Sequence, residues 1–573
     1  MNRFKSIIMS CQGKSKTFLH WLYNTHSDDD DEDEKVFDYR DLRFWFSGTG
    51  FRNTEKLIMY IGIPKEYFES IKESENLDTT VPTENYILYV LFPIISELQK
   101  EYRNDNKDAR EKAQFCIQEP DGCMDKKSGC LYCAESEKYV LQMHFNVPLV
   151  NATSVNSKAA FRAVKDILDH IFEAITNLKA EELVRWKRTY INQQTIRRYM
   201  KENHLCAFVA DGSILPRQDG TDKPMLGAKV FESPASMRVS ITTDIGETIT
   251  GMGIREGITI ITGGGYSGKT TLLDSIELGI YNHIPGDGRE YVLSETSALK
   301  TNAEDGRPVE NVDLTPFFRW LNGEALPDHF CTRHASGSVS QAANIIEAIE
   351  GRSKLILIDE DKSATNFMIR DKLMRKIVTD EPIIPFTDRI EELKNDRGVS
   401  TVMVIGGSSE YLAYADTVIL MSDFLPKDIS DDIRILAIDR STEQEKVSWH
   451  SSRTLKPQKT SQPFLYFHSV VTENEKKIIL DDHCADITNL TALTTPERLN
   501  TLMCVMEKML TDKEADSEQL LSKLIDYTDR TIGLKGSGNG FHIYGSERRF
   551  LSEIRPLDAW CCINRMRGVQ FMS

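Results

Sequence analysis

The sequence lacks any uninterrupted apolar run that approaches the roughly 20 residues of a membrane-spanning helix. A channel or pump built from membrane helices is therefore not expected. It also lacks a positive charge balance, because 87 acidic residues outnumber 70 basic ones and give a formal net charge of −17. This charge argues against a protein that binds polyanions over its whole surface, but it allows a local basic face. With 40% hydrophobic and 27% charged residues, the 573-residue chain is typical of a soluble globular protein of about two to four domains.

The cysteines are scattered and are not arranged as in a secreted disulfide framework. The chain has 11 of them and shows no secretory signal, so we expect reduced thiols and an intracellular location, in the cytoplasm or the mitochondrion. One cluster is denser and consists of Cys116, Cys123, Cys130 and Cys133. Four thiols within such a short segment can hold a structural Zn²⁺ ion. Ordinary cysteines in glycine-containing loops are the alternative.

Changes in charge mark the first expected domain boundary. Residues 1–27 contain basic residues and no acid, whereas residues 28–34 are all acidic. We expect residues 1–35 to be a disordered tail with an acidic linker, and a mitochondrial presequence is the alternative for the basic part. The rest of the chain is expected to form an N-terminal α+β domain over 36–202, a core with the motifs described below over 203–475, and a mainly helical C-terminal domain over 480–573.

A basic and aromatic stretch runs from Arg185 to Tyr199. Aromatic rings among Arg and Lys can stack on bases and neutralise phosphates, which would suit single-stranded RNA. The alternative is an amphipathic helix whose charged face is solvated. Arg565 and Arg567 form a second basic pair near the end of the sequence.

The strongest motif is a glycine-rich segment at residues 263–270, which reads G-G-G-Y-S-G-K-T. It follows the apolar run 258–261 and precedes the helical pattern of 271–276. In a strand–loop–helix unit of this kind, the loop N–H groups and the helix N-terminus face a pyrophosphate, the lysine reaches the outer phosphates and the threonine hydroxyl faces Mg²⁺. The motif therefore predicts a nucleoside triphosphate site. Its expected binding residues are Gly263, Gly264, Gly265, Tyr266, Ser267, Gly268, Lys269, Thr270 and Thr271.

Two further motifs lie downstream. The apolar residues 355–358 end in Asp359 and Glu360, as in a strand that ends at an active site. The first acid would join the Mg²⁺ shell and the second would orient or deprotonate water. The alternative is a core strand that continues into a polar turn. The phosphate-binding motif at 263–270 (the P-loop) makes this alternative less favoured. Residues 335–341, A-S-G-S-V-S-Q, open a helix whose N-terminus can bind an anion.

The order of these three motifs resembles that of ABC-type ATPase cassettes. The chain is more closely similar to the predicted ATPases of the ABC class, a soluble family distinct from transporters, and the matching segments include 208–217, 281–289, 359–367 and 563–565. The resemblance implies an α/β P-loop cassette with an N-terminal α+β domain and a mainly helical C-terminal domain. It also implies ATP and Mg²⁺ as ligands, and a homodimer in which each ATP lies between the P-loop of one subunit and the helix start of the other.

The same resemblance assigns roles to individual residues. Lys269 and Glu360 would be catalytic, and Thr270 and Asp359 would hold Mg²⁺. The partner subunit would contribute Ser336, Gly337, Ser338 and Gln341. One branch of the family, in kinetoplastid mitochondria, includes an RNA-editing factor, so the resemblance implies RNA as the partner.

Two features of transporter cassettes are missing. The apolar run 402–405 continues into Gly406-Gly407 with no histidine, and no glutamine occurs between Lys269 and Gln341, where Asp305 is a candidate substitute. These departures favour a slow, ATP-gated clamp over a fast motor, and the resemblance implies that the clamp acts on RNA. An ATP-dependent regulator of a protein complex, without nucleic acid, is the alternative. A GTPase is not expected, because residues 380–425 contain no N-K-x-D motif.

Overall fold

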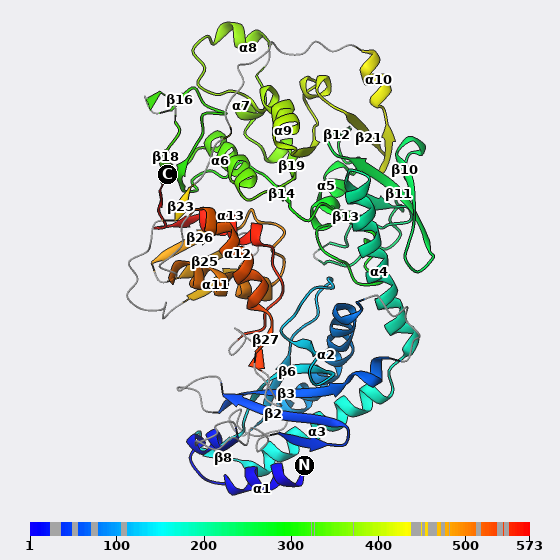
Figure 1. Ribbon diagram of the computed structural model, residues 1–573, viewed down its shortest axis with the longest axis vertical. Helices are drawn as coiled ribbons and strands as arrows, with labels where there is room; N and C mark the ends of the chain where they lie inside the picture. Colours follow the sequence, from blue (N-terminus) through cyan, green and yellow to red (C-terminus); the bar gives the residue numbers. More distant parts are fainter. Residues whose placement is uncertain are drawn as a thin grey trace. The chain divides into compact units, whose positions relative to one another are not determined.

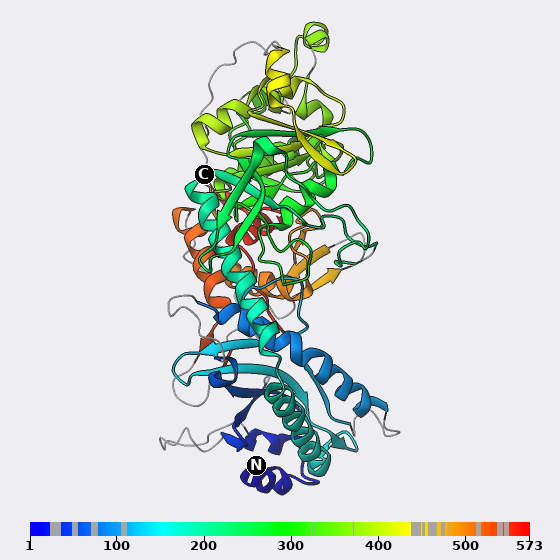
Figure 2. The same cartoon turned by 90° about the vertical axis from the view of Figure 1, so that its right-hand side faces the viewer.

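The computed structural model describes residues 1–22, 36–48, 55–69, 78–104, 112–219, 221–321, 324–325, 327–370, 372–436, 449, 453–455, 467–471, 476–480, 482–511, 517–535, 542–543 and 549–572. The chain forms two compact units (Figure 1). Unit 1 comprises residues 1–190 and 529–553, and unit 2 comprises residues 191–528 and 554–573. The division after Tyr190 falls inside helix α4 (Ala180–Glu202), visible in side view in Figure 2, and thus precedes the expected boundary at 202. No helix in the described ranges is long and apolar enough to cross a membrane.

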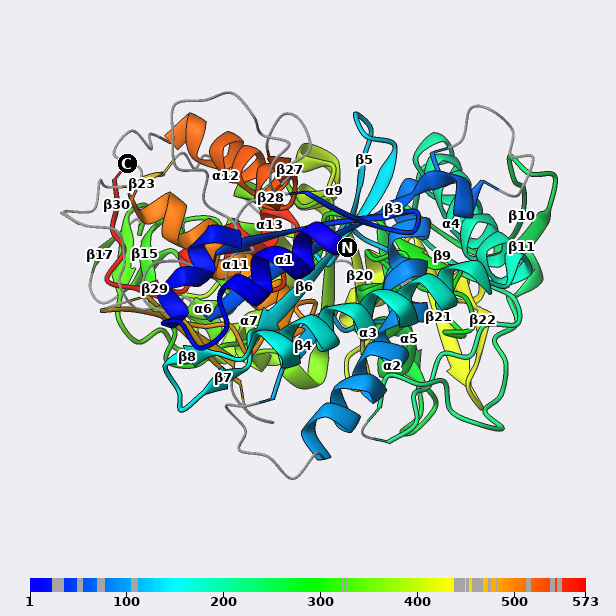
Figure 3. The same ribbon diagram turned by 90° about the horizontal axis from the view of Figure 1, so that it is seen from below.

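Unit 1 is built on an antiparallel sheet of order β1–β2–β3–β6–β4, with β5 also paired to β6. These strands are β1 (Phe37–Tyr39), β2 (Leu42–Gly48), β3 (Lys56–Pro64), β4 (Gln114–Ile117), β5 (Cys130–Cys133) and β6 (Lys138–Asn146). Three helices accompany the sheet: α1 (Asn2–Ser10), α2 (Thr80–Asn104) and α3 (Ser157–Thr176). Helix α3 lies beside both α1 and α2 (Figure 3). Short pairs complete the unit: β7 (Leu149–Val150) with β8 (Ser154–Val155), and β27 (Leu534–Lys535) with β28 (His542–Ile543).

The N-terminal segment is an ordered part of unit 1, in contrast to the disordered tail that we expected. Helix α1 buries Phe4 and Ile8, which lie on one helical face at i and i+4. The Phe4 ring packs against Phe37 and Phe44, with ring centroids 5.3 and 5.4 Å apart. A 3-10 helix, η1 (Lys16–Leu22), follows. The acidic block 28–34 lies outside the described residues.

Unit 2 is built on a six-stranded sheet of order β14–β19–β20–β12–β21–β22, in which only β22 runs antiparallel to its neighbour. The strands are β12 (Ile258–Gly263), β14 (Ala298–Lys300), β19 (Leu355–Asp359), β20 (Ser400–Val404), β21 (Thr417–Ser422) and β22 (Leu425–Asp428). All five residues of β19 and of β20 are buried, as expected for central strands of a parallel sheet. The helices of this part are α5 (Lys269–Leu278), α6 (Gly337–Glu350), α7 (Thr365–Met368), α8 (Lys372–Ile377), α9 (Ile390–Arg397) and α10 (Ser430–Ile435). The parallel sheet with its helices confirms the expected α/β class.

Two smaller sheets belong to the same unit. One has the order β10–β11–β9–β13 and the other the order β24–β25–β26–β29. Their strands are β9 (Leu205–Ala210), β10 (Arg238–Thr242), β11 (Thr248–Arg255), β13 (Val292–Ser294), β24 (Phe467–Val471), β25 (Lys476–Leu480), β26 (His483–Asp486) and β29 (Met566–Arg567). Two-residue to four-residue strands also form the pairs β15 (Val309–Val312) with β18 (Phe330–Thr332), β16 (Trp320–Leu321) with β17 (Glu324–Ala325), and β23 (Thr454–Leu455) with β30 (Phe571–Met572).

The C-terminal segment is packed onto the parallel-sheet core. It contains α11 (Pro496–Thr511), α12 (Ser517–Thr531) and α13 (Pro556–Asn564) together with the last sheet. The indole N–H of Trp560 donates to the carbonyl of Glu347 at 2.7 Å, which ties α13 to α6. The mainly helical domain expected over 480–573 therefore includes strands and shares one compact unit with the core, except for residues 529–553.

Candidate nucleotide-binding site

The glycine-rich loop has the geometry of a phosphate-binding turn. Strand β12 ends at Gly263, whose φ of 147° and close neighbour exclude a side chain, because a Cβ there would lie 2.4 Å from the Met421 carbonyl. Gly268 has a φ of 95°, and a Cβ at this position would lie 2.9 Å from the Phe424 ring. Both glycines let the loop pass close to the turn between β21 and β22 before α5 begins. The loop thus follows a buried strand and leads into a helix, as the motif predicts.

Individual loop residues occupy distinct positions. Lys269 Nζ donates to the carbonyls of Gly263 and Gly264, both at 2.8 Å, so its cation lies over the loop. The Tyr266 side chain is 100% exposed and its φ is 58°. The Ser267 hydroxyl is buried with no hydrogen-bond partner among the described residues. Thr270, the second residue of α5, is exposed.

The acidic pair and the loop both lie at the carboxyl ends of the parallel strands. Val404 of β20 is paired with Ile261 of β12 on one side and with Asp359 of β19 on the other. Asp359 therefore lies level with Ile261, two residues before Gly263. Adjacent strands are about 4.8 Å apart, so Asp359 is separated from β12 by about 10 Å, the width of one intervening strand. This register places the carboxylate across from the loop, at the carboxyl ends of parallel strands, where ligands bind in such sheets.

Asp359 is 2% exposed. Burial raises the pKa of its carboxyl group, while the N–H of Asp361 and the cation of Lys300 lower it. Lys300 itself is bound to Asp274 at 2.6 Å and Glu277 at 3.1 Å. Burial lowers the pKa of Lys300, but these two carboxylates outweigh burial and hold that pKa above its ordinary value. A carboxylate and a hydroxyl are oxygen donors of the kind that Mg²⁺ prefers, so the side chains of Asp359 and Thr270 fit this ion by their chemistry.

Glu360 has partners that sequence analysis missed. Its Oε2 atom accepts hydrogen bonds from the backbone N–H groups of Gly406 at 2.6 Å and Gly407 at 3.0 Å. These two glycines directly follow β20, the strand between β12 and β19. In the sequence, the only signal at this position was the absence of a histidine.

The serine–glycine motif forms the start of α6. Ser336 is the N-cap residue, is exposed, and makes no side-chain capping hydrogen bond. The first N–H groups of α6 therefore have no side-chain acceptor from their own cap. Gly337 and Ser338 are half-buried on the first turn. In the view of Figure 1, α5 and α6 are drawn on either side of β14 and β19.

Two expected site residues have other roles. Gln341, which we expected to bind the cofactor, is fully buried, donates to the Ser363 hydroxyl at 2.9 Å and accepts from the Ala364 N–H at 2.8 Å. A buried side chain that holds the segment after Glu360 cannot contact a ligand at the surface. Asp305 lies beside the start of α6, 3.2 Å from the position of a Cβ on Gly337, and is not at the end of β14.

The sequence motifs did not indicate that the residues directly after β14 belong to the site. Lys300 is opposite Leu357 in the register, so Asn302 is level with Asp359. The side-chain oxygens of Thr301 and Asn302 are buried and have no hydrogen-bond partner among the described residues. Asn302 thus offers a neutral amide at the strand next to β19, on the same edge as the loop.

A cavity of 460 Å³ adjoins the loop and contacts Gly268 and Thr271. Its other lining residues are mostly apolar or basic: Leu215, Pro216, Arg217, Met225, Ala228, Lys229, Phe231, Asp274, Arg289, Met421 and Phe424. Its rim is fixed by ion pairs, since Arg217 contacts Asp287 at 2.7 Å and Lys229 contacts Asp423 at 2.6 Å. An apolar cavity beside a phosphate-binding loop can accept the nucleoside part of a nucleotide.

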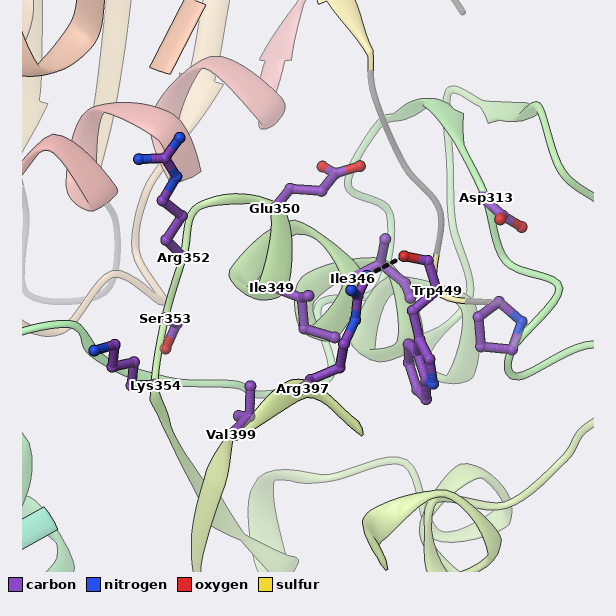
Figure 4. A pocket seen from close by; sticks show the side chains of 11 residues that line it. Asp313, Ile346, Ile349, Glu350, Arg352, Ser353, Lys354, Arg397, Val399 and Trp449 are labelled. Atoms are coloured by element: carbon purple, nitrogen blue, oxygen red, sulfur yellow. Dashed lines mark hydrogen bonds between the residues drawn. The ribbon is translucent and has the colours of Figure 1, made fainter. Parts of the chain in front are cut away.

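A second cavity, of 380 Å³, lies at the amino ends of the parallel strands (Figure 4). Its lining includes Lys354 and Val399, which directly precede β19 and β20. It also includes Ile346, Ile349 and Trp449. Because the P-loop lies at the carboxyl ends of these strands, this cavity is not part of the nucleotide site.

The proposed zinc cluster is not supported. All four cysteines are described, and the described part of the chain contains no group of three or more His, Cys, Asp or Glu residues that could hold a metal ion. Cys116 of β4 is opposite His144 of β6, whereas Cys133 of β5 is opposite Lys138. Six residues of one strand, about 20 Å, separate these two positions. The four cysteines are close in sequence. Cys116 and Cys133 are nevertheless far apart, because β4 and β5 pair with different ends of β6.

Comparison with known proteins shows similarity over part of the chain. Residues 179–458 match the family model for the ABC_ATPase P-loop domain. The uncharacterized protein MJ1628 of Methanocaldococcus jannaschii is 29% identical over 284 residues, which cover 48% of this chain and 62% of that protein. The chain thus aligns with less than two thirds of the length of this curated relative.

Two solved structures show weak similarity to parts of this chain. One is the ADP conformation of MJ1267, an ATP-binding cassette of an ABC transporter, with 15% identity, a TM-score of 0.23, and coverage of 33% of this chain and 87% of that chain. Another is cbiO1 from Clostridium perfringens, part of the ABC transporter complex cbiONQ, with 12% identity, a TM-score of 0.23, and coverage of 39% and 87%. The family match covers residues 179–458, just under half of the chain, and extends over the P-loop and the acidic pair.

Proposed function

We propose that this chain is an ATPase that binds ATP with Mg²⁺ at the P-loop and hydrolyses it slowly. In this proposal, two copies dimerise so that the start of α6 in one copy completes the site of the other. The observation that carries the proposal is the alignment of Asp359 and Glu360 with the end of β12 at one sheet edge, together with an uncapped helix start elsewhere on the same chain. Each chain would then hold two complementary half-sites of an ATP-gated clamp.

The residues divide the work at the site. The loop N–H groups and Lys269 bind the phosphates, and the cavity beside Gly268 takes the nucleoside. Thr270 and Asp359 would hold Mg²⁺, which would supply positive charge to offset that of the phosphate oxygens. Glu360 takes a proton from the attacking water. The amide of Asn302, which is level with Asp359, would take the place of the missing glutamine. No step in this scheme needs a titratable group after β20.

Exposed apolar residues around the P-loop support a partner surface. Besides Tyr266, the large hydrophobic residues Leu226, Val230 and Phe424 are 88%, 52% and 47% exposed. Met225, which lines the nucleoside cavity, is 38% exposed. An apolar rim around a charged site favours burial against a second molecule. A second copy of this chain would bury it while presenting Ser336 to Ser338 to the phosphates.

Complementation between two inactive variants tests the shared site. Lys269→Ala removes the P-loop cation, and Ser336→Asp places a carboxylate at the start of α6, where aspartate is a good N-cap but repels phosphate. We expect each variant alone to lack ATPase activity. A 1:1 mixture should regain about a quarter of the wild-type rate, because half of the dimers are mixed and each has one intact site out of two.

The readout is phosphate release from the mixture as a function of total protein. Recovery should rise with concentration, since it requires association of unlike copies. A mixture that stays inactive, or a Ser336→Asp protein that retains the wild-type rate by itself, would refute a site completed by the partner.

The partner of the clamp is a separate question, and the structure uses internally several of the residues that suggested RNA. Trp186 is 3% exposed and packs against the rings of Tyr86 and Tyr89. Lys187 is 6% exposed and donates to the Phe68 carbonyl at 3.1 Å. These contacts remove most of the local argument for base stacking.

Two of the other basic residues also have partners within the chain. Arg197 donates to the carbonyls of Gly279, Ile280, Tyr281 and Ser294 and so anchors the chain after α5. Arg565 is 4% exposed and pairs with Glu304 at 2.5 Å. Arg185 and Arg188 stay exposed. With a net charge of −17, these observations favour the alternative, a protein partner, over RNA.

A binding assay with single-stranded RNA decides between a protein partner and an RNA partner. We expect no measurable affinity for a fluorescent oligoribonucleotide at low salt, with or without ATP, in fluorescence anisotropy. RNA binding that falls steeply with salt, depends on ATP, and is lost in the double variant Arg185→Glu, Arg188→Glu would instead establish RNA as the partner.

A further inference from the structure

The segment after β20 is the most unusual part of the site. Two consecutive backbone N–H groups, those of Gly406 and Gly407, donate to one oxygen, Oε2 of Glu360, at 2.6 and 3.0 Å. Hydrogen bonds to an ionised group are short and strong compared with neutral ones. Because β20 lies between β12 and β19, this N–H pair lies between the P-loop and the acidic pair.

Neither backbone conformation nor packing explains why these residues are glycines. Neither has a positive φ. A Cβ on Gly406 would have Glu360 Oε2 as its nearest neighbour, at 3.9 Å, and a Cβ on Gly407 would have Oε1 at 3.5 Å. Both distances are ordinary van der Waals contacts or longer. Glycine here leaves the approach to the two N–H groups and to the carboxylate open, as where a backbone comes close to a ligand.

We propose that the N–H groups of Gly406 and Gly407 position Glu360 for hydrolysis, in the place where transporter cassettes have a histidine. This inference rests on the proposed ATPase function. Both N–H groups bind Oε2, so Oε1 is the oxygen that takes the proton from water. The water oxygen forms the new bond to the γ-phosphorus, the bond from that phosphorus to the bridging oxygen breaks, and ADP leaves with the electron pair.

The two N–H groups differ from a histidine in their chemistry. They donate hydrogen bonds but carry no charge and do not titrate near neutral pH. They therefore fix the direction of the carboxylate without adding a positive charge next to the phosphates. This difference is consistent with the slow turnover proposed above.

Substitution by proline tests the role of the donor, because proline has no N–H group. Gly406→Ala is the matched comparison, since alanine keeps the N–H group and its Cβ fits the space. We expect single-turnover phosphate release by Gly406→Pro to be about 10- to 100-fold slower than by Gly406→Ala, the effect of one hydrogen bond to a charged group. The ATP dissociation constants of the two variants should agree within about threefold, because the donor acts on the carboxylate and not on ground-state binding.

A double-mutant cycle separates positioning from general damage to the loop. In a Glu360→Ala background the ratio of the Gly406→Ala rate to the Gly406→Pro rate should fall to about one, since the acceptor is absent. Equal rates for the two glycine variants, or an unchanged ratio without Glu360, would overturn the inference. Gly407→Pro applies the same test to the second donor if Gly406→Pro does not fold.

The outcome also distinguishes this inference from the proposed function. A wild-type protein that does not hydrolyse ATP, or that loses nothing in Glu360→Ala, would contradict the ATPase itself. Normal dependence on Glu360 without a difference between proline and alanine would contradict only the role of the glycine N–H groups.

Discussion

Lys269→Ala should raise the dissociation constant for ATP with Mg²⁺ by roughly 100-fold or more, which corresponds to about 2.7 kcal/mol. The lysine ammonium is held over the loop by the carbonyls of Gly263 and Gly264, at 2.8 Å each. We therefore expect it to contact the phosphates without rearrangement of the loop. Alanine removes the cation and leaves the loop glycines and their contacts to Met421 and Phe424 unchanged.

Isothermal titration calorimetry on the full chain measures this affinity, and thermal unfolding checks the fold. Lys354→Ala is the matched control, because Lys354 is an exposed lysine at the opposite edge of the same sheet. Its affinity for ATP should equal that of the wild type. An unaltered dissociation constant in Lys269→Ala would show that the glycine-rich loop does not bind the phosphates.

Glu360→Gln should bind ATP as tightly as the wild type and lose at least about 100-fold in turnover, the usual contribution of a general base. The glutamine carbonyl can still accept the N–H groups of Gly406 and Gly407, which now bind Oε2. The loop geometry is thus kept while the proton acceptor is lost. This variant isolates the chemical step from binding.

Phosphate release at saturating ATP measures the effect. The control is Asp396→Asn, which neutralises an exposed carboxylate on α9 and should keep the wild-type rate. Undiminished phosphate release in Glu360→Gln would assign the base to another residue.

The local parts of the site could be predicted from sequence because each is encoded by contiguous residues. Glycine spacing between an apolar run and a helical pattern predicted β12, the loop and α5, and the apolar run 355–358 predicted a strand that ends at Asp359. The serine–glycine motif likewise marked the first turn of α6. Elements whose signals are short-range were therefore predicted in their order and type.

Features that depend on long-range pairing could not be predicted. The contact of Glu360 with Gly406 and Gly407 exists because β20 lies between β12 and β19, a strand order that no local pattern encodes. Gln341 was expected to bind the cofactor because of its place in the serine–glycine motif, but the packing of α6 on the segment after Glu360 buries it.

Long-range partners also decided the roles of charged and apolar residues. Arg565 looks like part of a basic surface in sequence, yet Glu304, some 260 residues earlier, buries it in an ion pair. At the N-terminus the basic charge of residues 1–27 suggested a disordered tail, whereas Phe4 and Ile8 lie on one face of a packed helix. Charge alone therefore predicted a tail where the apolar spacing specified a packed helix.

In the proposed function, ATP assembles two copies of this chain around shared sites. Light scattering of Glu360→Gln gives the mass of one chain, 65.3 kDa, or of two. We predict the mass of two chains with ATP and Mg²⁺ and of one chain with ADP. A mass of 65.3 kDa in both states, at a protein concentration where ATP saturates the site, would contradict the account.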